Sequence, residues 1–425
     1  MGESDSDLKG KLVSLIGSEH VTTNPELIID GLAPGLLAKP NSPEEVGECV
    51  RVCAEAGAAV VPAGLMTWLE TGNPLRRADV VLSLQRMNRI VDYSPPDLTV
   101  TAEPGVTISV LNEVVKAEGQ WLPLDPPGFD RASLGAIAAC ASSGPLRSGF
   151  GSPRDYVIGL RLAHADGSGS KSGGKVAKNV AGYDMNKLYV GSYGTLAVLT
   201  ELTFKLRPLP ESFQTAVIAG DLNSLVQISK CILASEVIPA SLFLTRGAFS
   251  GSERGRRGEW VLRVRFADND AAVRHQMSLI GKLAHGCEAR VPVAEEESMW
   301  SAVANLDRLG QNALRLSVPI SATPSVVEEA STILAECAVS ADLGTGVIRL
   351  AFDAEDDVVM NVTRELRLRI AKVGGNLVIE RASLAVRRAI DAWGETSATA
   401  GLMRAVKERF DSQSILNPGR FACGI

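Results

Sequence analysis

Hydrophobic and polar positions in the first part of the chain follow the pattern of an α/β protein. "NSPEEVGECVRVCAEAG" has apolar residues at helical spacing, with Ser42 as N-cap, Pro43 in the first turn and Gly57 as the stop. Glu45 stands at capping-box spacing from Ser42. The run "AAVVPAG" that follows predicts a buried strand. Residues 78–119 then predict two strands and a further helix.

The pattern changes between residues 121 and 175, where Ala, Gly and Ser dominate, as in "SLGAIAACASSG". Such small residues indicate a backbone packed closely against another group. The apolar run "YVGSYGTLAVLTELTFKLRPLP" predicts β-structure, and its prolines at 208 and 210 mark a domain boundary.

After this boundary, strand-like runs such as "EWVLRVRFA" and "GVIRLAFDA" alternate with helical runs such as "PSVVEEASTILAECA". This alternation predicts an α+β domain with an antiparallel sheet covered by helices. A last helix, "SATAGLMRAVKERFD", leads into the tail "SQSILNPGRF". The expected segments are 1–30, 31–210, 211–400 and 401–425.

Composition narrows the range of functions. A chain of 425 residues with 45% hydrophobic and 22% charged residues is typical of a globular protein with two or three domains. A net charge of −6 argues against nucleic acid or an anionic membrane as the main partner. No apolar run has the length of a membrane span, and the acidic N-terminus differs from a secretory signal. We therefore expect a cytoplasmic protein.

Cysteines and histidines offer little catalytic chemistry. The seven cysteines are scattered without a CxxC pair, so we expect buried or inert thiols, and no iron–sulfur cluster within the chain. The histidines show no paired metal or acid–base spacing: they are His20, His164, His275 and His285. Arg349 is a candidate for binding a carboxylate, but a surface or ion-paired arginine is the simpler interpretation.

Several motifs together resemble one family. Residues 178–210, "KNVAGYDMNKLYVGSYGTLAVLTELTFKLRPLP", closely resemble the signature segment of FAD-binding domains of the vanillyl-alcohol-oxidase, or PCMH, type. "LTVTAEPGVTISVLNEVVKAEG", "SLGAIAACASSG" and "SILNPGRF" are similar to the same family. "AEGQWLPLDPP", "GSPRDYVIGLRL" and "KNVAGYD" look most like the FAD-binding subunits of glycolate oxidase, the GlcE type. The resemblance covers residues 35–210 and the last twenty, and it implies a two-part FAD domain to which the C-terminal tail returns.

The resemblance implies FAD, whose pyrophosphate this family holds on successive backbone N–H groups. The corresponding loop here has one glycine, Gly64, where the commonest family loop has three. Leu65 and Met66 are acceptable there if their backbone angles are right-handed or extended, with their side chains directed away from the phosphates. A working phosphate loop is favoured, and a loop that has lost flavin or a plain turn are the alternatives. Because residues 62–74 contain no His or Cys, we expect noncovalent binding.

The implied cofactor-binding residues lie in four segments, of which residues 194–199 match the strand at the pyrimidine edge of the flavin. They are Ala63, Gly64, Leu65, Met66, Thr67, Gly72, Asn73, Pro104, Gly105, Ser133, Leu134, Gly135, Ala138, Ser143, Gly144, Gly151, Gly194, Thr195, Leu196 and Val198. Structural alternatives stay open, with Gly135 and Gly194 as tight turns and Thr67 and Ser133 as local caps. No catalytic residue is assigned.

Three functions compete. The first is an FAD-binding subunit of a glycolate oxidase complex, with a second flavoprotein and an iron–sulfur subunit as partners and contact to the inner membrane only through them. The second is an independent FAD-dependent 2-hydroxy-acid dehydrogenase of the D-lactate type. The third is a non-enzymatic scaffold that has lost FAD. The scarcity of histidine favours the first over the second.

Overall fold

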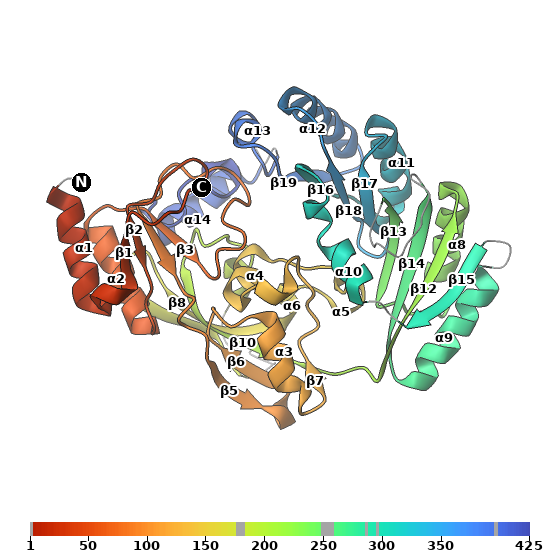
Figure 1. Ribbon diagram of the computed structural model, residues 1–425, viewed down its shortest axis with the longest axis horizontal. Helices are drawn as coiled ribbons and strands as arrows, with labels where there is room; N and C mark the ends of the chain where they lie inside the picture. The colour runs from red at the N-terminus through yellow and green to blue at the C-terminus, as the bar shows by residue number, and fades with distance from the viewer. Residues whose placement is uncertain (1–2, 176–182, 248–258, 285–287, 295–296, 395–397) are drawn as a thin grey trace. The chain divides into compact units, whose positions relative to one another are not determined.

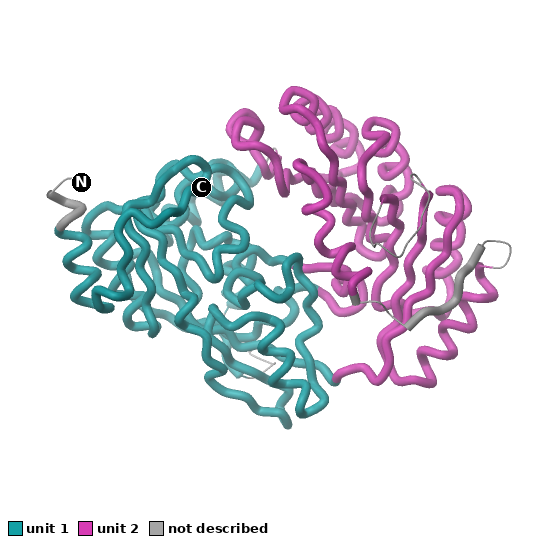
Figure 2. Tube along the Cα trace, viewed as in Figure 1, with its two compact units in different colours: residues 1–142, 152–208, 395–425 teal, residues 143–151, 209–394 magenta. Residues whose placement is uncertain are grey.

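The computed structural model describes residues 3–175, 183–247, 259–284, 288–294, 297–394 and 398–425. The chain divides into two compact units, coloured separately in Figure 2. Unit 1 comprises residues 1–142, 152–208 and 395–425, and unit 2 comprises residues 143–151 and 209–394. Much of the quoted "KNVAGYD" motif lies outside the described residues.

Unit 1 contains a small four-stranded sheet with the order β1-β2-β4-β3 (Figure 1). Its strands are β1 (Val21–Thr23), β2 (Leu36–Ala38), β4 (Val80–Ser83) and β3 (Val60–Ala63), and β2 and β3 run parallel to β4. Helices α1 (Glu3–Ile16) and α2 (Pro43–Glu55) contribute Leu12, Val46 and Val50 to its core.

The N-terminus of α2 is capped, but not by the reciprocal box that the spacing suggests. Ser42 Oγ accepts a hydrogen bond from Glu45 N at 3.1 Å, whereas the Glu45 carboxylate accepts from Asn41 N at 2.7 Å.

A second sheet of unit 1 has five strands, all antiparallel, in the order β5-β6-β10-β8-β9. They are β5 (Ile90–Ser94), β6 (Thr99–Ala102), β10 (Val198–Lys205), β8 (Val157–Ala163) and β9 (Gly169–Gly173). Residues 78–119 therefore contain three strands, β4, β5 and β6, and the prediction of two was wrong. The missed strand, β5, is an edge strand without fully buried residues, so its sequence lacks a strong apolar signal.

Shorter elements complete unit 1. They are α3 (Ile108–Lys116), α4 (Leu134–Cys140), α6 (Pro153–Tyr156), α7 (Asn186–Tyr189), α14 (Ala400–Phe410), the pair β7 (Gln120–Trp121) and β11 (Arg207–Pro208), and four short 3₁₀ turns among the described residues.

Unit 2 is built on an eight-stranded antiparallel sheet with the order β15-β12-β14-β13-β17-β18-β16-β19. The strands are β12 (Ser212–Gly220), β13 (Ser241–Arg246), β14 (Trp260–Asp268), β15 (Glu288–Ala294), β16 (Asn312–Ser317), β17 (Ala338–Asp342), β18 (Val347–Phe352) and β19 (Asn376–Arg381). The predicted α+β class with a helix-covered antiparallel sheet is confirmed. The strand order could not be read from the sequence.

Four helices cover one face of this sheet and share its main hydrophobic core (Figure 1). They are α8 (Leu222–Leu233), α9 (Asp270–Leu283), α11 (Thr323–Ile333) and α12 (Asp356–Ala371). Among the described residues, the opposite face, here called the open face, carries a small apolar cluster with α10 (Glu297–Ala304) and η4 (Leu306–Arg308). Helices α5 (Arg147–Phe150) and α13 (Leu384–Ala389) complete the unit.

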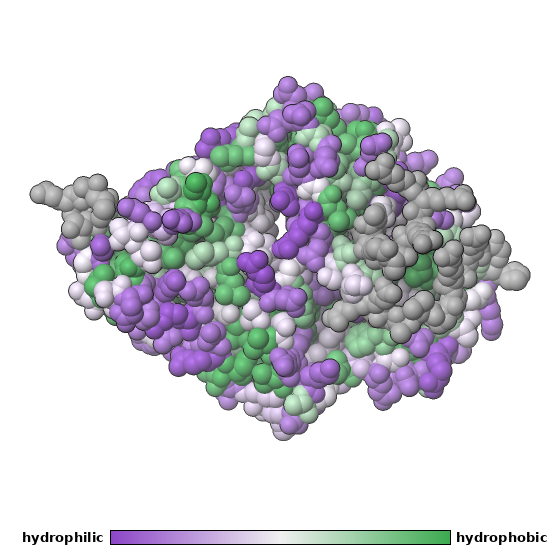
Figure 3. All heavy atoms as spheres, in the orientation of Figure 1, coloured by the Kyte–Doolittle hydropathy of each residue, from purple (hydrophilic) through white to green (hydrophobic). Residues whose placement is uncertain are grey.

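The surface is of mixed polarity. Hydrophilic side chains cover much of the face seen in Figure 3, with hydrophobic ones between them in small groups. Within the described ranges, no helix has the length and apolar character needed to cross a membrane.

Candidate functional site

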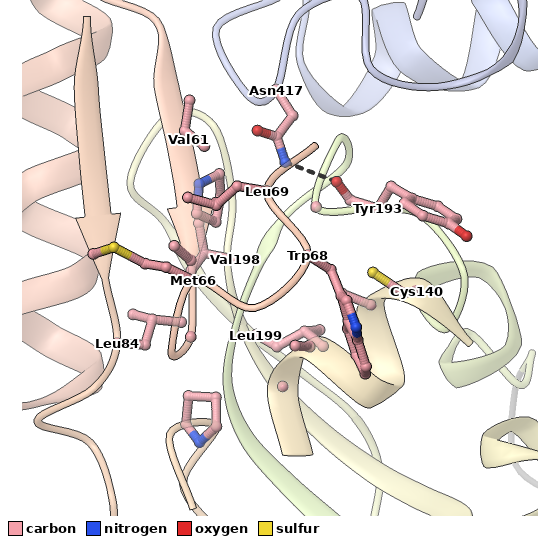
Figure 4. A pocket seen from close by; sticks show the side chains of 18 of the residues that line it. Val61, Met66, Trp68, Leu69, Leu84, Cys140, Tyr193, Val198, Leu199 and Asn417 are labelled. Carbon is pink, nitrogen blue, oxygen red and sulfur yellow. Dashed lines mark hydrogen bonds between the residues drawn. The ribbon is translucent and has the colours of Figure 1, made fainter. Parts of the chain in front are cut away.

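Unit 1 contains a pocket whose wall combines several separate parts of its sequence. It encloses about 760 Å³ of empty space, including space open to solvent. The wall comes from β3 and the loop after it, the turn at Pro104, the helix α4, the start of β10 and the C-terminal tail (Figure 4). The pocket thus lies where the sequence placed its candidate cofactor segments.

Part of the predicted residue set lines this pocket. The lining members are Ala63, Gly64, Met66, Thr67, Pro104, Gly135, Gly194 and Val198. Other predicted members of unit 1 lie outside the lining: Leu65, Gly72, Asn73, Gly105, Ser133, Leu134, Ala138, Thr195 and Leu196. Ser143, Gly144 and Gly151 belong to unit 2.

The loop after β3 offers free hydrogen-bond donors. Among the described residues, the backbone N–H groups of Met66, Thr67 and Trp68 donate to no other residue, and all three residues line the pocket. Successive N–H groups without protein partners are the elements of an anion-binding nest. The residues present therefore fit the pyrophosphate of a dinucleotide.

Met66 corrects one expectation about this loop. Its φ angle is +59°, in the left-handed region, and it lines the pocket instead of turning away from it. Leu65 does not have a positive φ and does not contribute to the wall. The loop therefore adopts, with a methionine, a conformation that usually favours glycine.

Two glycines of the pocket are required by the protein itself. A Cβ atom on Gly64 would collide with Ser133 Oγ, and one on Gly135 would lie 2.6 Å from Pro104 Cβ. Gly194 has φ +65°, and a Cβ there would meet Asn417 Nδ2 at 3.0 Å. Small residues at these positions thus allow close approach between segments of the wall, whatever ligand lies in the pocket.

The two predicted hydroxyl groups have structural roles. Thr67 Oγ1 donates to the carbonyl of Arg131 at 3.0 Å, which fastens the loop. Ser133 is the N-cap of α4, where its Oγ accepts from Ala136 N at 3.4 Å.

Sequence reasoning missed the contribution of the C-terminal tail to the pocket wall. Asn417, with φ +44°, donates from Nδ2 to the carbonyl of Tyr193 at 2.8 Å (Figure 4). Arg420 also lines the pocket and is ion-paired with Asp30 at 2.9 Å. The motif "SILNPGRF" is one of those that resemble the family. Its polar residues Asn417 and Arg420 are the signal that could have placed it in the pocket wall.

Cys140 and two aromatic residues were also missed. Cys140 lies at the end of α4 and lines the pocket with Trp68 and Tyr193. Burial raises the pKa of the Cys140 thiol to about 12. The thiol is therefore protonated near neutral pH, which makes it a poor nucleophile.

The histidines lie elsewhere. His20 ends a 3₁₀ turn, His164 Nε2 pairs with Ser170 Oγ at 2.7 Å, and His275 lies on α9. None of these three lines the pocket, and His285 falls outside the described residues. In the part of the chain that the structure describes, no group of three or more His, Cys, Asp or Glu side chains could hold a metal ion.

Arg349 is ion-paired, as the simpler interpretation of the sequence had it. Its Nε lies 3.1 Å from Glu380 Oε2 in unit 2. Among the described cysteines, Cys49, Cys53 and Cys337 are buried and Cys231 is exposed, while Cys287 lies outside the described residues.

Comparisons with known proteins assign the cofactor. A family model described as "FAD binding domain" matches residues 34–171. Glycolate oxidase subunit GlcD of Bacillus subtilis is 34% identical over 210 residues, 49% of this chain and 45% of that protein. Glycolate oxidase subunit GlcE of Escherichia coli is 43% identical over 124 residues, 29% of this chain and 35% of that protein. The chain thus spans less than half the length of these two relatives.

Two other likenesses extend along nearly the whole chain. The probable mitochondrial D-lactate dehydrogenase of Danio rerio is 27% identical over 419 residues, 91% of this chain and 84% of that protein. The structure of p-cresol methylhydroxylase has a TM-score of 0.76 at 16% identity, covering 99% of this chain and 97% of that one, which shows a shared fold. Residues 34–171 therefore match an FAD-binding domain, and the cofactor is FAD.

Proposed function

We propose that this protein is the FAD-binding subunit of a glycolate oxidase complex, in which a 2-hydroxy acid is oxidised and electrons pass to an iron–sulfur partner. The likeness to both GlcD and GlcE supports a role in such a complex, with a second flavoprotein as the other partner. The structural observation that carries the proposal is the set of unpaired N–H groups at Met66, Thr67 and Trp68 in the pocket wall.

The pocket residues have distinct tasks in this proposal. The N–H groups of residues 66–68 would hold the pyrophosphate oxygens, while the short side chains of Ala136 and Ala139 leave room beside α4. Trp68 and Tyr193 would exclude water from the pocket wall. Bound FAD supplies the redox chemistry, taking up the two electrons released when glycolate becomes glyoxylate.

We propose that FAD is held noncovalently. The loop 62–74 contains no His or Cys, and the one thiol that we place in the wall, Cys140, is protonated because burial raises its pKa. Purified protein should be yellow with about one FAD, and acid precipitation should leave the flavin in the supernatant. Colour that stays with the pellet would contradict this proposal.

Steady-state assays with an artificial electron acceptor test the complex. The isolated chain should oxidise glycolate and D-lactate slowly, and co-purification with a second flavoprotein and an iron–sulfur protein should restore turnover.

The likeness to the D-lactate dehydrogenase along 91% of the chain favours a second candidate, a stand-alone dehydrogenase. Turnover by the isolated chain on the order of 10 per second, typical of a complete enzyme, would decide for that candidate.

A further inference from the structure

The open face of the unit 2 sheet carries two arginines that share one carboxylate. Arg315 on β16 and Arg349 on β18 stand directly opposite each other in the strand register. Arg315 Nε lies 2.9 Å from Glu380 Oε1, and Arg349 Nε lies 3.1 Å from Glu380 Oε2. The three side chains are only 25%, 16% and 21% exposed, so Glu380 on β19 holds two guanidinium groups in a largely buried position.

This arrangement leaves the outer ends of both guanidinium groups available. In the described part of the chain, the two terminal nitrogens of Arg349 have no hydrogen-bond partner, and Arg315 uses only Nη1, which donates to Ser317 Oγ at 3.3 Å. These nitrogens are not among the buried side-chain atoms without a hydrogen-bond partner, so those that lack a partner are at least partly accessible to solvent. Two positive charges against one negative charge leave a net charge of about +1 at a fixed place.

A further carboxyl group, Asp307, lies in η4, which packs over β16, β17 and β18. Its Oδ1 is enclosed and has no hydrogen-bond partner. The charged groups that act on it are Glu380, Arg349, Arg308 and Arg381. Asp307 thus belongs to the same cluster, although it makes none of the ion pairs that hold Arg315 and Arg349.

We propose that Arg315 and Arg349, positioned by Glu380, form a binding site for one small carboxylate anion, and that Asp307 controls the charge of this site. This proposal deepens the proposed function and rests on it for the identity of the anion, because a 2-hydroxy acid is a small carboxylate. The terminal N–H groups of a planar guanidinium suit the two oxygens of a carboxylate better than a spherical ion. A net charge near +1 matches a monoanion.

Asp307 would make the site sensitive to pH. Burial is the largest cause that raises the pKa of Asp307, and the negative charge of Glu380 raises it further. The positive charges of Arg349, Arg308 and Arg381 oppose this shift. While Asp307 is protonated, the cluster keeps its positive charge. When pH rises through this elevated pKa, Asp307 ionises and the net positive charge around the two guanidinium groups falls by one. Anion affinity should therefore decrease with rising pH.

Calorimetric titration of the FAD-loaded protein with sodium acetate tests the site without turnover, because acetate has no hydroxyl group to oxidise. We expect Arg349→Gln and Arg315→Gln each to weaken acetate binding at least tenfold. Arg349→Lys keeps the charge but loses the planar fork, and it should also bind several-fold more weakly than the parent. The matched control is Arg364→Gln, which removes an exposed arginine of α12 and should leave affinity unchanged.

Acetate affinities of Arg315→Gln and Arg349→Gln equal to that of Arg364→Gln would overturn the site, provided circular dichroism shows folded protein. For the pH effect, acetate affinity is compared between about pH 5.5 and pH 8.5, where acetate stays ionised. The parent should lose affinity over this range and Asp307→Asn should not; identical pH profiles would overturn the role of Asp307. Binding of glycolate at this site without its oxidation would contradict the proposed function, but it would leave the anion-binding site intact.

Discussion

At the scale of single residues, Met66 is the most informative position of the pocket. A non-glycine residue in the left-handed region is disfavoured by about 1–2 kcal/mol, and a β-branched residue is disfavoured more strongly. The φ of +59° nevertheless places three N–H groups in the wall of the pocket. The loop therefore depends on a conformation that its own side chain resists.

Substitutions of Met66 should separate conformation from side-chain contact. We expect Met66→Gly to keep FAD affinity within about threefold of the parent, whereas Met66→Val should weaken it about tenfold or more, since a conformational cost of about 1.4 kcal/mol corresponds to a factor of ten. Fluorescence titration of the apoprotein with FAD measures both. Leu65→Val is the matched control, because residue 65 has no positive φ. Equal affinities for Met66→Val and Leu65→Val would contradict this explanation.

The glycines of the pocket wall indicate how much of the site can be predicted from the sequence. The sequence predicts that FAD comes close to residues 64 and 135, but a sequence does not say which atoms of the protein itself also lie there. At Gly64 and Gly135 the approaching atoms belong to Ser133 and Pro104. A valine at either glycine should therefore disturb the wall itself, so loss of FAD binding in such variants cannot by itself locate the cofactor.

At the scale of elements, the C-terminal tail is fastened by a buried ion pair. Lys407 Nζ on α14 contacts Asp411 Oδ2 at 2.6 Å and also donates to the carbonyls of Thr195 and Leu416. The carboxylate of Asp411 in turn accepts from the N–H groups of residues 415 and 416. Burial lowers the pKa of Lys407, while Asp411 opposes this shift. One ion pair thus connects α14, the segment before β10 and the tail.

Breaking this pair should be costly. Lys407→Met leaves the carboxylate of Asp411 buried without its cation, and we expect the free energy of unfolding to fall by about 3–5 kcal/mol. Urea denaturation followed by circular dichroism measures the change. Arg409→Met on the exposed side of the same helix is the control and should stay within about 0.5 kcal/mol of the parent. If both variants unfold at the same urea concentration, the Lys407–Asp411 ion pair does not stabilise the attachment of the tail.

Elements with a strong periodicity of hydrophobic residues could be predicted from the sequence, whereas elements that depend on tertiary contacts could not. The helix α2 and the strands β14, β16, β18 and β19 follow from apolar spacing. The edge strand β5 escaped because none of its residues is fully buried. The return of the tail to this unit was expected only from the family resemblance. Val60 pairs with Leu416 across more than three hundred residues, and no local pattern records such a contact.

At the scale of the whole molecule, unit 1 is discontinuous in sequence. Three stretches of chain form it, and the last one begins at residue 395. Removal of residues 401–425 would take away Lys407, Asn417 and Arg420, and with them part of the pocket wall. We expect this truncated chain to lose FAD binding.

Size-exclusion chromatography with absorbance at the flavin wavelength tests this expectation. The truncated chain should elute colourless even when FAD is added in excess. A useful control removes only residue 425, which lines no part of the pocket. A yellow truncated chain would show that the tail is dispensable for the cofactor.

The tail that closes the pocket also imposes an order on biosynthesis. The loop that bears the unpaired N–H groups emerges from the ribosome early, but residues 395–425, which complete unit 1, are translated after all of unit 2. At about 5–20 residues per second, the roughly 190 residues between positions 208 and 395 take about 10–40 s to synthesise. For that time the nascent pocket has an open wall, so we expect stable flavin binding only after residues 395–425 have been synthesised.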